Sequence, residues 1–313
     1  MKQSVLLGVV AVCGWQVAFA HPSIILGTDE YEFVYKVQLP KDSKNLRMWV
    51  PVAKSDAFQM VRVERSPSSL KKVQDRAYGN EILVADESSD VSGPVELRYK
   101  VRRKEKESYA ASERDVAKYL MPERLVPTNQ TFYTLASEAV KGRTTTLEKG
   151  RALYDHVLDR MKYDKSGTGW GRGDAVYACD AKTGNCTDFH AYFIALARSV
   201  GIPARFAIGF TIPAETNEGK IAGYHCWGEF YADGKWVPVD ISEADKAPEL
   251  ADYYFGHHPA NRFEVTKGRD LVVDPAPSAS PINFLVYPLV EVDGKPVQAQ
   301  TEFSFRRIKE AKQ

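Results

Sequence analysis

The periodicity of the hydrophobic residues changes along the chain, and this change most limits what the chain can fold into. From Tyr31 to about Arg103, apolar and polar residues alternate in segments such as YEFVYKVQLP, LRMWVPV and VELRYKVRR, which turn residues separate. A two-residue period is typical of half-buried strands. From about Thr131 the apolar residues recur at helical spacing instead. We therefore predict an α+β protein in which an all-β domain, most simply a β-sandwich, precedes a mixed domain.

The first 20 residues have the features of a secretory signal. Lys2 precedes an apolar run from Val5 to Val12, and the small residues of AFA end at Ala20. Such a segment is removed on export, so we expect a mature chain that begins at His21 and works in the periplasm or outside the cell. No later run approaches the ~18 apolar residues that a membrane span needs.

The balance of charges indicates no particular partner. The 313 residues include 42 Lys and Arg against 41 Asp and Glu, without a long block of either sign. A surface for nucleic acid or for an anionic membrane is therefore not expected.

Two helices and a glycine-rich loop are expected in the first part of the mixed domain. One helix spans residues 131–140, and another follows Thr145, with Glu148 in the capping-box position. The segment KSGTGWGRGDAVY comes next, and its glycines alternate around Trp170. Their spacing does not match a dinucleotide-binding fingerprint. The segment is either a flexible loop that carries one aromatic side chain or a lid over a substrate.

A further helix is marked at both ends. Asn185 suits the N-cap, Asp188 the third helical position, and Gly201 and Pro203 the end, which predicts a helix over residues 186–200. Cys186 then lies in the first turn, where free amides and the helix dipole favour a thiolate and can hold an oxyanion. A cysteine in this position can equally be a small buried residue.

A hairpin brings a histidine and an aspartate together. With an Asp-Gly turn at residues 233–234 and Tyr231 opposite Trp236, His225 and Asp240 become diagonal neighbours on one face of the ribbon. Their β-carbons would then be ~7 Å apart or less, which two side chains can bridge. This register assumes a strand that continues to residue 242. The opposite face carries side chains expected in the core: Cys226, Phe230, Val237, Val239 and Ile241.

Cys186, His225 and Asp240 would together supply the three groups of a nucleophilic site. Cys186 would attack, His225 would act first as base and then as acid, and Asp240 would orient the imidazole and stabilise its charged form. His190 is the rival base. Because helical side chains lean toward the N-terminus, His190 would reach the thiol from beneath, so we interpret it as support.

The remaining cysteines allow two other interpretations. Removal of the signal leaves Cys179, Cys186 and Cys226, and zinc binding by these residues with His225 is conceivable. Since His225 and Cys226 are neighbours on a strand, they point to opposite faces, and we expect neither a metal nor a cofactor. If Cys186 stays free, Cys179 and Cys226 remain as a possible disulfide.

The segments GNC, ARSVGIPAR, GYHCWGEFY and WVPVD resemble the transglutaminase-like superfamily over about Leu147–Ser242. The resemblance implies a papain-like core, in which a helix that bears Cys186 packs on an antiparallel sheet, with Cys186, His225 and Asp240 as the triad. The β domain resembles the one that often precedes this core in exported bacterial proteins. The expected organisation is a signal peptide over residues 1–20, a β-sandwich over 21–107 and a catalytic domain with the C-terminal strands over 108–313.

The resemblance also separates this chain from animal transglutaminases. Their calcium loops have no evident counterpart here, which favours hydrolysis over calcium-dependent crosslinking. In those enzymes a tryptophan helps to hold the oxyanion, and Trp170 and Trp227 are the candidates for such a substrate contact.

The expected function is that of an exported cysteine peptidase or amidase that forms a thioacyl intermediate. One alternative is a transamidase or acyltransferase that uses an amine as acceptor. Another is a non-catalytic module that binds a peptide or glycan. The expected substrate is a peptide or a protein, and cell-wall peptides are included. A single sequence does not indicate which of these substrates is used.

Overall fold

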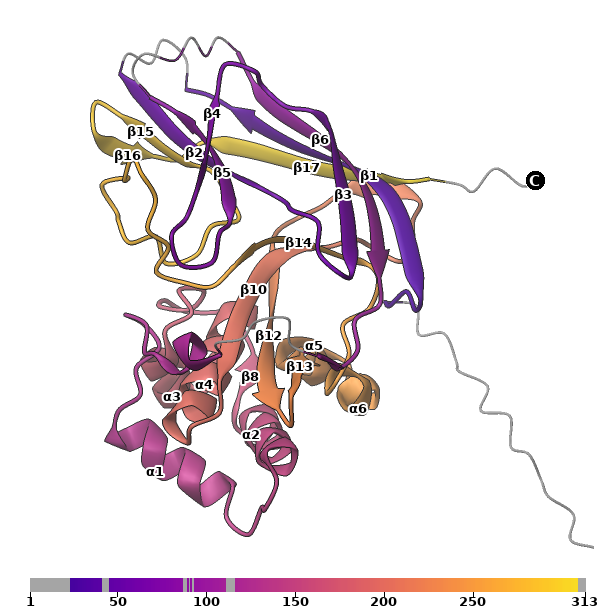
Figure 1. Cartoon of the computed structure of the whole chain (residues 1–313), viewed down its shortest axis with the longest axis vertical. Helices are drawn as coiled ribbons and strands as arrows, with labels where there is room; N and C mark the ends of the chain where they lie inside the picture. Colours follow the sequence, from indigo (N-terminus) through magenta and orange to yellow (C-terminus); the bar gives the residue numbers. More distant parts are fainter. Residues whose placement is uncertain are drawn as a thin grey trace, which may run out of the picture.

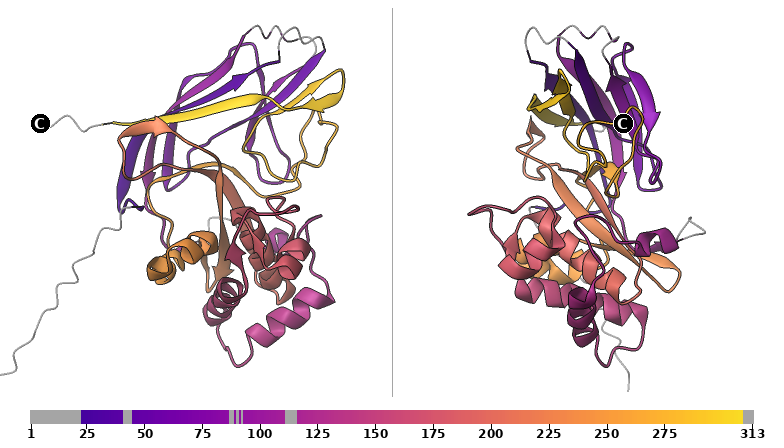
Figure 2. Two further views of the ribbon diagram at one scale, coloured as in Figure 1. Left: turned by 180° about the vertical axis from the view of Figure 1, so that it is seen from behind. Right: turned by 90° about the vertical axis from the view of Figure 1, so that its left-hand side faces the viewer.

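Two modules lie one above the other in the computed structural model, an all-β upper module and a lower module that contains the helices (Figure 1). The structure describes residues 23–308 apart from 41–44, 87–88, 90, 92 and 111–115. The expected signal peptide and the expected mature start at His21 lie outside the described residues. The views in Figure 2 show that the helices gather in the lower module.

Two five-stranded antiparallel sheets form the upper module. The order in the first sheet is β11 (Glu218–Lys220), β17 (Gln300–Arg307), β1 (Thr28–Gln38), β6 (Val95–Lys104) and β3 (Gln59–Arg65). The order in the second is β16 (Lys295–Val297), β15 (Leu289–Val292), β2 (Leu46–Val52), β5 (Glu81–Ala85) and β4 (Lys71–Gln74). Along β1 every second side chain is buried, which the alternation in the sequence predicted.

The C-terminal strands belong to the upper module. β17 pairs with β1 from Tyr31↔Arg307 to Gln38↔Gln300, and β15 pairs with β2. This differs from the expected second domain, which ran to residue 313 and included these strands. The physical reason is that β1 and β2 would otherwise present open edges, and the alternating segments near the C-terminus supply the missing partners.

The lower module consists of an antiparallel sheet with helices packed on it, as the fold class predicted. The sheet order is β14 (Arg262–Lys267), β10 (Ala204–Thr211), β12 (His225–Ala232), β13 (Lys235–Val239) and β7 (Tyr109–Ala110). The helices are α1 (Gln130–Ala139), α2 (Thr146–Arg160), α3 (Ala175–Ala181), α4 (Cys186–Ser199), α5 (Ile241–Lys246) and α6 (Ala251–Tyr254), with 3-10 turns η1 (Ala117–Leu120) and η2 (Pro248–Leu250). A two-stranded parallel pair, β8 (Lys162–Tyr163) and β9 (Thr183–Gly184), precedes α4.

The helix α4 is the centre of the lower module. All its side chains from Cys186 to Arg198 are buried, because β10 and β12 cover one side and other helices cover the rest. The sequence predicted a single apolar face, so the extent of burial is greater than expected. The predicted capping boxes at Asn185 and Asp188 and at Thr145 and Glu148 are both present.

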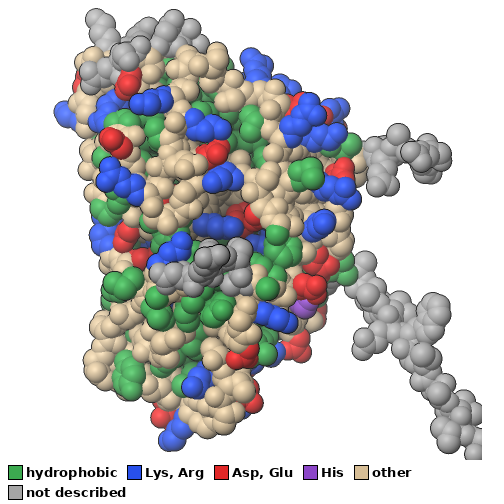
Figure 3. All heavy atoms as spheres, in the orientation of Figure 1, with side chains coloured by type: hydrophobic (Ala, Val, Ile, Leu, Met, Phe, Trp, Pro, Cys, Tyr) green, Lys and Arg blue, Asp and Glu red, His purple; other side chains and the backbone are tan. Residues whose placement is uncertain are grey.

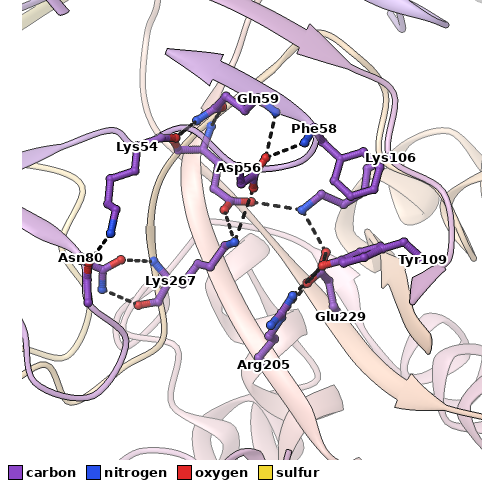
Figure 4. Close-up of polar contacts among 12 residues, drawn as sticks. Lys54, Asp56, Phe58, Gln59, Asn80, Lys106, Tyr109, Arg205, Glu229 and Lys267 are labelled. Atoms are coloured by element: carbon purple, nitrogen blue, oxygen red, sulfur yellow. Dashed lines mark hydrogen bonds and ion pairs between the residues drawn. The ribbon is translucent and has the colours of Figure 1, made fainter. Parts of the chain in front are cut away.

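Side-chain amides join the upper module to the exposed edge of β14 (Figure 4). Gln59 donates to the carbonyl of Glu264 at 2.9 Å and accepts from its amide at 2.8 Å. Asn80 makes the same two bonds to the backbone of Lys267, each at 2.8 Å. These amides take the place of another strand, so the edge of the lower sheet is covered.

A buried group of charges lies beside these amides (Figure 4). Lys106, whose side chain is 1% exposed, lies 3.0 Å from Glu229 and 3.4 Å from Glu264. Arg205 contacts the other oxygen of Glu229 at 2.6 Å. Tyr109 donates its hydroxyl to the same carboxylate. We call these five residues the junction cluster.

The visible surface shows no patch of one charge. On the face in Figure 3, Lys and Arg side chains are interspersed with Asp and Glu. Among the described residues, we find no helix of the length and hydrophobicity that crossing a membrane requires.

Candidate active site

Cys186 is the first residue of α4 and is 2% exposed. Asn185 caps the helix, since its Oδ1 accepts from the amide of Thr187 at 2.9 Å. Asp188 accepts in return from the amide of Asn185 at 3.0 Å. The thiol of Cys186 is therefore held at the positive end of a rigid helix, where the field favours a thiolate.

His225 and Asp240 form a short hydrogen bond, with 2.7 Å between Nε2 and Oδ2. His225 begins β12, and Asp240 directly follows β13. The predicted hairpin register is confirmed, because Tyr231 pairs with Trp236 and Gly228 with Val239. The expected continuation of the strand to residue 242 is wrong. Asp240 instead caps α5 by accepting from the amide of Glu243 at 3.2 Å, which turns the chain into a helix.

The protonation of His225 follows from its partners. Burial disfavours the charged ring, but the negative charge and hydrogen bond of Asp240, with the hydrogen bond that the ring donates to Cys186, raise the pKa of His225 to about 9. Since Nε2 faces Asp240, the ring presents Nδ1 to the sulfur. At neutral pH His225 therefore carries two protons.

Cys186 is stabilised in its ionised form. Burial opposes ionisation, but hydrogen bonds from Cys226 and His225, together with the positive charge of His225, hold the pKa of Cys186 well below the usual thiol value. Combined with the raised pKa of His225, this gives a thiolate and an imidazolium in contact at neutral pH. Such a pair is ready to attack a carbonyl and then to protonate a leaving group.

Arg262 is a further component of the site that the sequence did not reveal. This residue of β14 is 1% exposed, and its Nη2 lies 3.2 Å from Oδ2 of Asp240. Burial raises the pKa of Asp240, but the charges of His225 and Arg262 hold this pKa far below its usual range. Asp240 thus stays ionised between two cations. No local pattern could identify Arg262, because the pairing of β14, β10 and β12 across the sheet brings it to Asp240.

His190 faces the backbone and not the sulfur of Cys186. Its Nδ1 lies 2.7 Å from the carbonyl oxygen of Cys186, and its Nε2 accepts from the amide of Ile241 at 3.2 Å. The proton must therefore be on Nδ1, and burial lowers the pKa of His190, which keeps the ring neutral. Both nitrogens are engaged in joining the start of α4 to the start of α5.

The suggested disulfide between Cys179 and Cys226 is wrong. Cys179, Cys186 and Cys226 are all free thiols. The alternation of β12 directs Cys226 toward α4, where its sulfur lies 3.7 Å from Nδ1 of His190 and hydrogen-bonds with Cys186. Cys179 lies on α3 and contacts the hydroxyl of Tyr192. Burial and the neighbouring thiolate raise the pKa of Cys226 well above the usual value, so Cys226 remains a neutral donor.

The two candidate tryptophans have different surroundings. Trp227 is 0% exposed and lies between the rings of His225 and His258, with centroid distances of 5.9 and 5.7 Å. Trp227 has no exposed surface and packs beside His225, and its role as a substrate contact stays a prediction. Trp170 is half-buried, and its indole faces the ammonium of Lys165 at 5.9 Å. Trp170 therefore remains as the accessible indole of the pair.

The glycine-rich loop is pinned to the helix that carries Cys186. The amides of Gly171 and Gly173 donate to the two carboxylate oxygens of Asp188 at 2.7 and 3.0 Å. Both glycines have positive φ angles, of 83° and 61°, which other residues rarely adopt. A β-carbon at Gly173 would also lie 2.7 Å from Nη1 of Arg269. The segment, which we expected to be either a flexible loop or a lid, is thus held beside the start of α4.

Comparisons with known proteins bear on the family and the fold. Residues 133–241 match the sequence model of the Transglutaminase-like superfamily, and they include Cys186, His225 and Asp240. An uncharacterized protein of Haemophilus influenzae is 27% identical over 355 aligned positions, which cover 96% of each chain.

The fold has a counterpart among solved structures. A candidate cysteine protease from Cytophaga hutchinsonii superposes with a TM-score of 0.58 at 16% identity, over 91% of this chain and 93% of that one. The periplasmic domain of TgpA from Pseudomonas aeruginosa reaches a TM-score of 0.40 at 16% identity, over 73% of this chain and 93% of that one. From the matched residues, we conclude that residues 133–241 form a transglutaminase-like core.

Proposed function

We propose that the protein is an exported cysteine hydrolase that cleaves amide bonds of peptides or proteins. The observation that carries this proposal is the buried chain of contacts from Cys186 through His225 to Asp240, with 2.7 Å between the last two side chains. A thiolate at a helix start and an imidazolium beside it are the nucleophile and the acid that cleavage of an amide requires.

In the proposed reaction, the thiolate of Cys186 attacks the carbonyl carbon and the carbonyl electron pair moves to oxygen. The backbone amide of Cys186 points out of the helix start and can donate to this oxyanion. When the carbon–nitrogen bond breaks, Nδ1 of His225 gives its proton to the leaving amine. Asp240, kept ionised by Arg262, holds the ring in place throughout.

Water completes the cycle. Neutral His225 takes a proton from water, the resulting hydroxide attacks the thioester, and the acyl group leaves as a carboxylic acid while the thiolate of Cys186 is restored. An amine in place of water would give a transamidation product from the same thioester.

The test is a comparison of wild type and Cys186→Ala in water enriched in oxygen-18, with a digest of cell wall and a mixed peptide library as substrates. Wild type is expected to release fragments whose new carboxyl groups carry the heavy isotope, and Cys186→Ala is expected to release none. Cys179→Ala is the matched control, since that thiol lies on α3 and contacts Tyr192.

Two results would contradict the proposal of hydrolysis. Joined products without the isotope would assign the thioester to transfer onto amines. Equal mass spectra from wild type and Cys186→Ala would show that no cleavage depends on Cys186, and would favour a binding role.

A further inference from the structure

Tyr224 connects the two segments that carry Cys186 and His225. It directly precedes His225, and its hydroxyl accepts a hydrogen bond from Nδ2 of Asn185 at 2.9 Å. Asn185 in turn directly precedes Cys186. The hydroxyl of Tyr224 therefore lies at the open end of α4, and its half-buried side chain keeps some contact with solvent.

The neighbours of Tyr224 fix the direction of its hydroxyl group. The Oδ1 of Asn185 accepts from the amide and the hydroxyl of Thr187 at 2.9 and 2.6 Å, so Nδ2 must face Tyr224. The ring of Tyr224 packs edge-on against Tyr287 at 5.6 Å, and the Tyr224 amide donates to the Tyr287 hydroxyl at 3.2 Å. Both the ring and its oxygen are thus held from two sides.

The hydroxyl proton of Tyr224 is available for a ligand. The oxygen accepts from Asn185, and Thr187 is its other side-chain hydrogen-bond partner. The O–H group can rotate from Thr187 toward a ligand, because Thr187 is neutral and an oxyanion is the stronger acceptor. The hydrogen bond that Asn185 donates to the Tyr224 oxygen also polarises the O–H group, which makes this group a stronger donor. Burial and the negative charge of Cys186 raise the pKa of Tyr224, so the hydroxyl keeps its proton at physiological pH.

Gly171 leaves room for a substrate atom at this place. A β-carbon built on Gly171 would lie 3.4 Å from Nδ2 of Asn185 and 4.0 Å from the hydroxyl oxygen of Tyr224. The pinned loop therefore borders the hydroxyl without a side chain at this residue. Tyr224 and Gly171 thus both border Asn185, the residue that directly precedes Cys186.

We propose that the hydroxyl of Tyr224 and the backbone amide of Cys186 together hold the oxyanion of the reaction, a role that rests on the proposed function. As the sulfur–carbon bond forms, the carbonyl electron pair moves to oxygen, and Tyr224 donates a hydrogen bond to it without giving up its proton. The carbonyl re-forms when the carbon–nitrogen bond breaks, and the amine takes its proton from His225. Tyr224 is then a catalytic residue, because it touches the reacting oxygen.

The experiment compares two reactions of Cys186 that differ in one respect. Acylation by p-nitrophenyl acetate passes through an oxyanion, whereas alkylation by iodoacetamide does not. In Tyr224→Phe the acylation rate constant should fall on the order of 100-fold, as for loss of one oxyanion donor elsewhere. The alkylation rate and its pH profile should stay as in wild type. Tyr133→Phe removes an exposed hydroxyl on α1 and should change neither reaction.

The possible outcomes separate this role from the proposed function. Equal acylation by wild type and Tyr224→Phe overturns the role of Tyr224 alone, and so does an equal loss in both reactions, which would place Tyr224 in thiolate positioning. Acylation of wild type that does not depend on Cys186 overturns the proposed function together with this role.

A second variant covers the case in which Tyr224→Phe does not fold. A fluorinated tyrosine incorporated at position 224 loses its proton at lower pH, and acylation should fall with that ionisation while alkylation does not. An acylation rate that is unaffected by the ionisation overturns the role.

Discussion

The junction cluster and the candidate active site are both buried groups of charges, and they differ in the kind of side chain. At the junction, Lys106 and Arg205 surround Glu229, and although burial raises the pKa of Glu229, the two cations hold it well below its usual value. Glu229 therefore stays ionised between the two cations. At the site, the corresponding groups are the thiol of Cys186, whose pKa is lowered, and the imidazole of His225, whose pKa is raised. Burial of charge alone therefore indicates structure, and burial of groups that can exchange a proton indicates chemistry.

The largest expected effect is a loss of activity, without a loss of stability, on substitution of Cys186 at the candidate active site. Cys186→Ala removes the nucleophile, so Cys186-dependent acylation should fall by about 10⁴-fold or more. The midpoint of urea unfolding should change little, because the site loses one sulfur atom. Stopped-flow release of p-nitrophenol measures the rate. An acylation rate like that of wild type would contradict the assigned nucleophile.

The reverse pattern is expected at the junction. Glu229→Gln removes the buried negative charge that Lys106 and Arg205 both contact, which should lower the free energy of unfolding by about 3–5 kcal/mol. The acylation rate of the folded fraction should stay as in wild type. Urea titration followed by tryptophan fluorescence measures the first quantity. Glu302→Gln, which removes an exposed partner of Lys220, is the control and should unfold like wild type.

The pH dependence should also distinguish the regions. Cleavage of a peptide anilide needs the proton of His225, so the rate should fall about tenfold per unit as pH rises above about 9. In Asp240→Asn the charge that raises the pKa of His225 is lost, and this fall should begin at lower pH. Rates measured from pH 5 to about 11 give both profiles. An unchanged profile in Asp240→Asn would contradict the contact as the cause of the shift.

The smallest expected effect concerns Cys226. Cys226→Ala removes a hydrogen bond to the thiolate, so the pKa of Cys186 should rise and alkylation at acidic pH should slow by about tenfold or less. Cys226→Ser keeps a donor and should lie closer to wild type. The pH profile of iodoacetamide labelling measures this. If the alkylation rate fell more in Cys226→Ser than in Cys226→Ala, the contact would not be what stabilises the thiolate.

Local features of the sequence predicted the parts of the structure that depend on near neighbours. Caps placed α4 to within one residue, since Asn185, Asp188 and Gly201 act within a turn of the helix ends. The Asp-Gly turn fixed the hairpin register, and through it the approach of His225 to Asp240. The alternation of apolar residues predicted the strand LRMWVPV with the bounds observed for β2.

Contacts between distant segments could not be predicted in this way. Arg262 reaches Asp240 through the order of strands in a sheet, and Tyr224 reaches Asn185 because β12 crosses the start of α4. Burial of Trp227 depends on His258, which lies 31 positions later in the chain. Periodicity indicates which face of a strand is covered, but not which segment covers it.

The pairing of β1 with β17 has a consequence for biosynthesis. β1, the first strand of the described chain, pairs with β17, which is synthesised near the end. The upper sheet therefore keeps an open edge until residues 300–307 have been made. A nascent chain therefore cannot fold one module at a time from its N-terminus, in contrast to most proteins with two domains. A ribosome that stops before β15 releases a product with two unpaired sheet edges, which we expect to aggregate or to be degraded.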